Sequence, residues 1–164
     1  MAESLMPTQP TRDGNNAFAI SIGLLMLRLA LGAVFVFHGG QKAFGWFDGP
    51  GLQAFAGMDA IKAMPVLPPM AWAAMAAYGE FFGGVGVLLG LLTRAAVVPI
   101  MVSMFVAIWQ VHGKNGFDMG KGGYEYNIVL LAMCVMLMLA GGGLVSADAF
   151  LFRRGFWARG AQPG

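Results

Sequence analysis

Eight polar or aromatic residues stand at the ends of long apolar segments, where they could bind a small ligand. They are His38, Lys42, Trp109, His112, Tyr124, Glu125, Tyr126 and Asn127. His38 and Lys42 are four residues apart and share one helix face if the helix continues past residue 38. Imidazole, phenol and indole groups could hydrogen-bond a quinone head group. Side chains of these types also form interfacial belts with no specific role, and the sequence leaves both interpretations open.

Metal and thiol chemistry have weaker support. His38, His112 and Glu125 are metal-ligating types, but two histidines without close spacing form no recognised motif, so we predict no metal site. The 13 methionines lack a paired pattern and are interpreted as flexible packing side chains. The single cysteine, Cys134, cannot form a disulfide within the chain.

Two charged residues interrupt the apolar segments themselves, namely Arg28 and Glu80. A charge within a membrane costs free energy unless it has a partner or water. Arg28 lies about 16 Å from the start of its expected span, and Glu80 lies about 18 Å from the end of its own. Because the two spans run antiparallel, these two ends are on the same side of the membrane. We therefore predict that Arg28 faces Glu80, as a structural ion pair or as part of a polar path. The alternative is that Arg28 reaches the interface and Glu80 is protonated.

The elements that must position these residues are membrane helices. Hydrophobic residues make up 58% of the 164-residue chain and charged residues only 11%, too few to cover a small soluble domain. Four apolar segments are long enough, or nearly so, to cross a bilayer. We predict spans over about 17–38, 70–92, 95–112 and 126–145. Glycines at 83, 84, 86 and 90 predict close helix packing in the second span.

The predicted fold class is all-α, an integral membrane four-helix bundle with antiparallel up-down topology. Residues 17–150 form the membrane domain, preceded by a disordered tail over 1–16 and followed by a basic tail over 151–164. A signal peptide at the first span and a buried soluble bundle are the less favoured alternatives. The net charge of +2 and the lack of a basic patch give no indication of nucleic-acid binding.

Orientation follows from the lysines and arginines that flank the spans. Five arginines (12, 94, 153, 154 and 159) lie on the side of the two tails, and four lysines (42, 62, 114 and 121) lie on the other side. The arginine pair after the last span favours both termini in the cytoplasm, with the two longer loops outside.

Several motifs in order resemble one known family. Arg28, His38-Gly39, Lys42, Glu80 with its glycines, Thr93-Arg94 and Gly123-Tyr124-Glu125-Tyr126 occur with the spacing of the DoxX family of small bacterial membrane proteins. The resemblance covers roughly residues 24–151. It departs near the end, where Gly141-Gly142-Gly143 and Ser146-Ala147-Asp148 replace the family's Gly-Pro-Gly and Ser-Leu-Asp.

The resemblance implies a four-helix protein of the bacterial inner membrane, associated with redox complexes and in some members with quinone. No haem, flavin, nucleotide or catalytic motif is present, so the chain would be at most a subunit of an oxidoreductase and would receive electrons from a partner. We expect lipid and other membrane or redox proteins as partners, with a homo-oligomer possible. A small transporter with Arg28 and Glu80 along its path, or a non-catalytic scaffold, is the alternative.

Overall fold

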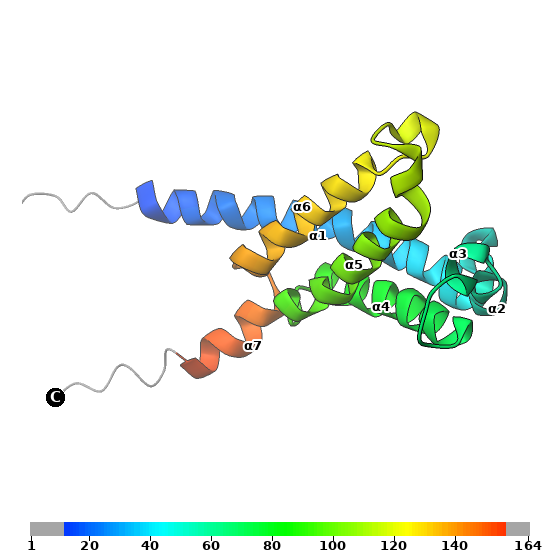
Figure 1. The fold of residues 1–164 in the computed structure, drawn as a ribbon. Helices are drawn as coiled ribbons and strands as arrows, with labels where there is room; N and C mark the ends of the chain where they lie inside the picture. The colour runs from blue at the N-terminus through cyan, green and yellow to red at the C-terminus, as the bar shows by residue number, and fades with distance from the viewer. Residues whose placement is uncertain (1–11, 157–164) are drawn as a thin grey trace, which may run out of the picture.

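A computed structural model describes the backbone of residues 12–156 and the side chains of residues 16–151. This part of the chain is all-α, with no strand. Its principal helices are α1 (Arg12–Phe44), α4 (Pro69–Leu89), α5 (Thr93–Ala107), α6 (Glu125–Ala140) and α7 (Ala147–Phe156). Two short helices, α2 (Gly51–Ala56) and α3 (Asp59–Lys62), connect α1 to α4 in the chain and lie at the end of the structure where α1 ends and α4 begins (Figure 1).

Helices α1 and α4 pack against each other along most of α4 because glycines remove side-chain bulk where the backbones meet. A Cβ on Gly84 would lie 2.7 Å from the backbone nitrogen of Val36, and one on Gly39 would overlap the backbone of Phe81. A Cβ on Gly83 would lie 2.8 Å from the carbonyl oxygen of Ala96 on α5. Small residues permit this approach in membrane bundles, so the predicted close packing of the second span is confirmed.

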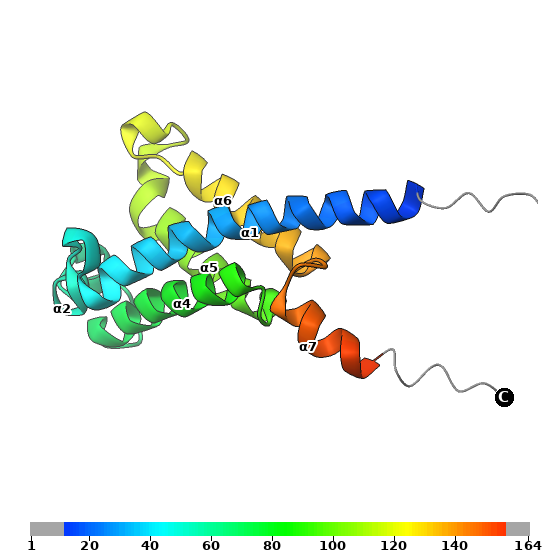
Figure 2. The same ribbon diagram turned by 180° about the vertical axis from the view of Figure 1, so that it is seen from behind.

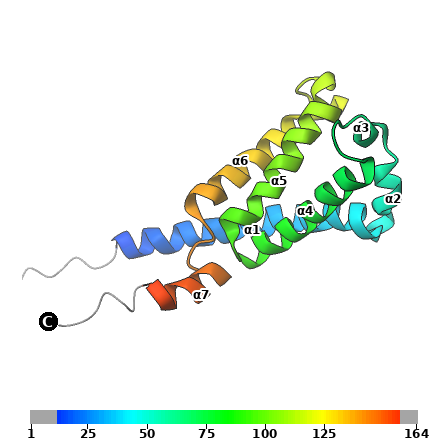
Figure 3. The same ribbon diagram turned by 60° about the horizontal axis from the view of Figure 1, so that its bottom comes forward.

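The four long helices of the described part, α1, α4, α5 and α6, form two pairs that spread apart. Helices α4 and α5 meet at the tight turn 90–92, which we call the closed end. Toward Phe44, His112 and Glu125, the open end, the pair α5–α6 diverges from the pair α1–α4 (Figures 1 and 3). Figure 2 shows the same divergence from behind.

The larger of two core clusters among the described residues fills the closed half of this arrangement, and a smaller one joins α1 and α2 to α4 at the open end. Leu31, Val87, Val97, Ile100 and Leu137 are fully buried and belong to one cluster contributed by all four long helices. Apolar contact of this kind holds the closed half together, while the open half retains cavities.

Within the described part of the chain, three helices are long and apolar enough to cross a membrane, over Asn16–Phe44, Pro69–Leu89 and Thr93–Asn115. The third is α5 continued by a π-helical segment, η2 (Ile108–His112), and a 3₁₀ turn, η3 (Gly113–Asn115). The fourth predicted span corresponds to α6, an apolar helix of only 16 residues.

The predicted tails differ from the structure where it describes them. Residues 1–11 and 157–164 lie outside the described part, while residues 12–16 continue α1 and residues 151–156 belong to α7. Helix α1 also continues past residue 38 to Phe44, through Gly39 and Gly40. That extension keeps His38 and Lys42 on one helix.

Candidate functional site

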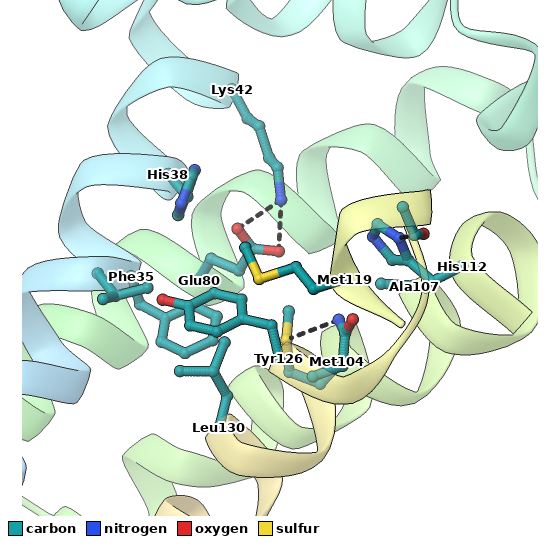
Figure 4. Close-up of a pocket in the computed structure, with 14 residues that line it drawn as sticks. Phe35, His38, Lys42, Glu80, Met104, Ala107, His112, Met119, Tyr126 and Leu130 are labelled. Atoms are coloured by element: carbon teal, nitrogen blue, oxygen red, sulfur yellow. Dashed lines mark hydrogen bonds and ion pairs between the residues drawn. The ribbon is translucent and has the colours of Figure 1, made fainter. Parts of the chain in front are cut away.

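A cavity of about 330 Å³ lies between the diverging helix pairs at the open end; we call it the central pocket. Five of the eight residues predicted for an outer-face pocket line it: His38, Lys42, His112, Tyr126 and Asn127. Phe35, Met104, Met119 and Leu130 supply apolar wall (Figure 4). A mostly apolar cavity with a few convergent polar groups is the usual form of a small-molecule site.

An ion pair between Lys42 and Glu80 forms the charged part of the wall. The Lys42 Nζ lies 2.6 Å from both carboxylate oxygens of Glu80, and the Ser103 hydroxyl donates to the same carboxylate. The Glu80 side chain is fully buried, whereas Lys42 keeps 26% of its side-chain surface exposed. The ammonium therefore neutralises the buried carboxylate, and the lysine that carries it forms part of the cavity wall.

The π-helical segment η2 carries His112 at its end. Insertions of this kind in α-helices often occur at functional sites. The His112 Nδ1 donates to the carbonyl oxygen of Gly122 at 2.8 Å, which fixes the ring to the loop before α6. In the neutral ring, Nε2 is then a hydrogen-bond acceptor.

Helix α6 supplies the opposite wall. Asn127 is buried, and its amide nitrogen lies 3.4 Å from the Met104 sulfur on α5. Tyr126 extends from α6 toward Phe35 of α1, with its hydroxyl within the gap between the helix pairs (Figure 4). The pocket thus combines residues from helices far apart in sequence.

Three predicted pocket residues do not line this cavity. Trp109 is 67% exposed on the outside of the bundle. The Tyr124 ring packs against Phe117 in the loop, with ring centroids 5.7 Å apart. Glu125 begins α6 and is partly buried. These positions fit the interfacial belt, the alternative interpretation of this cluster.

The predicted contact between Arg28 and Glu80 is wrong. Arg28 is buried at the closed end, where its guanidinium donates to four backbone carbonyls. Its acceptors are Val87, Leu88, Gly142 and Val145, at 2.6–2.9 Å. These carbonyls lie at the end of α4 and in the segment after α6, where helical hydrogen bonding leaves acceptors free. Arg28 therefore caps two chain segments.

The error came from the helix ends assumed in counting depth. The glycine contacts place Gly39 beside Phe81 and Gly84 beside Phe35 and Val36. In this antiparallel register, Glu80 lies level with the last turns of α1. Lys42 reaches it, whereas Arg28 lies level with the end of α4.

Sequence reasoning missed Ser103 and Met104. Ser103 is the lone hydroxyl within the apolar segment 95–112, and this isolation was the available signal. Met104 was grouped with the other methionines, and only the fold shows that it faces the cavity. Among the described residues, no group of three or more histidine, cysteine, aspartate or glutamate side chains is placed to hold a metal.

Comparison with known proteins agrees with the family resemblance. The DoxX family model matches residues 23–113, which include His38, Lys42, Glu80, Ser103 and His112. A Bacillus subtilis (strain 168) protein with the name "Putative oxidoreductase CatD" is 32% identical over 135 residues, covering 82% of this chain and 91% of that protein. None of the solved structures matches the chain.

Proposed function

Since the chain belongs to the DoxX family, we propose that it is a membrane subunit or accessory protein of a redox system whose central pocket binds a quinone head group. The relative named as an oxidoreductase supports the redox association. The observation that carries the quinone proposal is the Lys42–Glu80 pair, which places a charged hydrogen-bond donor in the wall of an otherwise mostly apolar cavity.

The chemistry of the pocket suits such a ligand. A quinone has a flat apolar ring with carbonyl oxygens that accept hydrogen bonds. The Lys42 ammonium and the Tyr126 hydroxyl are donors from opposite walls, while Phe35 and Met104 offer apolar contact to a ring. The volume of about 330 Å³ lies at the lower end of the range for small-molecule sites. Electrons would come from a partner oxidoreductase.

The membrane arrangement that we propose has four spans, with both termini in the cytoplasm of a bacterium and the pocket toward the outer face. Helix α6 is about 24 Å long, short of a hydrocarbon core of about 30 Å. Its antiparallel packing on α5 supports its assignment as the fourth span. A locally thinned bilayer would accommodate its length.

A transport path along Arg28 and Glu80 has less support. Val87, which accepts from Arg28, lies two helical turns beyond Glu80, about 10 Å along α4. Leu31, Val97 and Ile100 are fully buried at this level, within the same core cluster. A solute leaving the pocket would have to displace that core, so we favour binding over permeation.

A pair of matched tyrosine variants tests the quinone proposal. Tyr126→Phe removes only the hydroxyl in the pocket, and Tyr124→Phe removes one that lies outside it. With purified protein in lipid nanodiscs, we expect Tyr126→Phe to weaken quinone binding by about fivefold, the cost of one hydrogen bond. Tyr124→Phe should leave binding unchanged.

His38→Ala adds a second pocket variant, and Glu125→Gln a second control. His38 is exposed and holds its ring nitrogen 3.2 Å from Gln41, so its loss should not disturb the fold. Quinone content and affinity that are unchanged in both Tyr126→Phe and His38→Ala would refute quinone binding in this pocket.

A further inference from the structure

A second cavity opens on the side of the bundle; we call it the side groove. It measures about 210 Å³ and is lined by Met64, Trp72, Met75, Pro99, Val102 and Val106, among others. The Trp72 indole donates to the carbonyl oxygen of Pro65 at 2.9 Å, which ties the segment before α4 over the groove. The walls are therefore apolar and come from α4, α5 and the segment that precedes α4.

The groove lies on the outer surface of two helices that are long enough to cross a membrane. Met75 is 50% exposed and Val102 is 55% exposed, on α4 and α5 respectively. Both residues belong to helices long and apolar enough to span a bilayer. An apolar groove at such a position opens toward lipid acyl chains rather than toward water.

One residue that lines the groove contacts the charged wall of the central pocket. Ser103 lines the groove, and its hydroxyl donates to the Glu80 carboxylate. A third cavity of about 230 Å³, the linking cavity, shares Ala76 and Ser103 with the groove. It shares Lys42, Glu80 and His112 with the central pocket.

The three cavities thus adjoin one another through shared lining residues, and their lining changes from polar beside the Lys42–Glu80 pair to apolar at the lipid side. We infer that the ligand of the central pocket is an amphipathic, membrane-borne molecule, whose apolar tail lies in the side groove and which enters between α4 and α5. This inference rests on the proposed function. It specifies an isoprenoid quinone rather than a tailless, water-soluble one.

Two valine variants on one helix test the inference. Val102→Trp fills the groove at its exposed rim, where a larger side chain can be accommodated without disturbing the core. Val98→Trp is the matched control, because Val98 is 46% exposed one helical turn away and does not line the groove. Each variant is compared with the parent protein in nanodiscs, using a long-tailed quinone and a tailless quinone with the same head group.

Each variant is compared with the parent protein for one quinone at a time. A difference between the two quinones in partition into lipid therefore does not affect the comparison. We expect Val102→Trp to weaken binding of the long-tailed quinone by about tenfold, as when roughly two methylene groups lose their burial. Binding of the tailless quinone should not change. Val98→Trp should bind both quinones as the parent does.

The outcomes separate the two proposals. If Val102→Trp leaves binding of the long-tailed quinone unchanged, or weakens both quinones equally, the tail does not occupy the groove, while the head-group pocket still stands. If neither quinone binds the parent protein, the proposed function fails and the tail assignment fails with it.

Discussion

Lys42 on α1 holds both carboxylate oxygens of Glu80 on α4 at 2.6 Å, and this is the ion pair that joins the first two membrane helices. The carboxylate has no exposed surface and takes a further hydrogen bond from Ser103 on α5. Three helices thus meet at one buried charge. The same pair is the charged wall of the central pocket, so its contributions to stability and to binding must be measured separately.

Neutralising Glu80 should destabilise the protein strongly. Glu80→Gln leaves the Lys42 ammonium without a counter-charge, and breaking a buried pair costs about 3 kcal/mol when one partner retains some solvent access. Replacing both partners, in Glu80→Gln with Lys42→Met, should recover part of that loss. The stability of each variant is measured by thermal unfolding in detergent. A thiol-reactive fluorophore detects unfolding, because it labels the buried Cys134 once the thiol becomes exposed. Strictly additive losses in this cycle would contradict the contact.

Arg28 and Glu80 should behave independently in the same assay. They share no hydrogen bond and occupy different ends of the bundle, so the losses in Arg28→Gln and Glu80→Gln should add within about 0.5 kcal/mol. A larger coupling energy would show that the two charges interact in the folded protein.

Lysine should not be able to replace Arg28, because the guanidinium group donates to several carbonyl groups at once. Arg28→Lys keeps the charge but cannot reach four carbonyls on two segments, so we expect a loss of about 2–3 kcal/mol in the free energy of unfolding. Arg94→Lys is the control, because Arg94 is exposed and donates to the single carbonyl of Leu139. Equal melting temperatures for the two variants would argue against the capping role.

Composition and apolar segment length were enough to predict the long helices. Such segments must satisfy their own backbone hydrogen bonds in lipid, which leaves helices as the local solution. The glycines of the second span likewise predicted close packing, because only glycine permits backbone contact there. Grouping His38 and Lys42 also succeeded, since a spacing of four residues sets a helix face whatever the bundle looks like.

The ion-pair partners could not be read from depth alone. Helix register depends on which glycines meet which backbone atoms, as at Gly39 and Gly84, and on where helices end. The depth count set residue 17 level with residue 92, whereas the structure places Arg28 itself level with the end of α4. The π-helical segment that ends at His112 and the spreading of the helix pairs are properties of tertiary packing, which no local pattern contains.

Gly84 should be intolerant of a side chain. A Cβ there would meet the backbone nitrogen of Val36 at 2.7 Å, and backbone cannot move aside as a flexible side chain can. Gly84→Ala should therefore cost about 1–3 kcal/mol and separate α1 from α4. Gly23→Ala serves as the control because nothing lies within 4 Å of its added Cβ. A neutral Gly84→Ala would contradict the helix contact on which the Lys42–Glu80 register depends.

The number of membrane crossings can be measured with single cysteines. In a Cys134→Ala background, Leu91→Cys, Lys114→Cys and Leu151→Cys place one thiol at the closed end, in the loop before α6 and in α7. If α6 crosses the bilayer, an impermeant thiol reagent applied to sealed vesicles of known orientation labels position 114 from one side. Positions 91 and 151 are then labelled only from the other side. Labelling of 114 and 151 from the same side would show that α6 does not cross and that the fourth span is wrong.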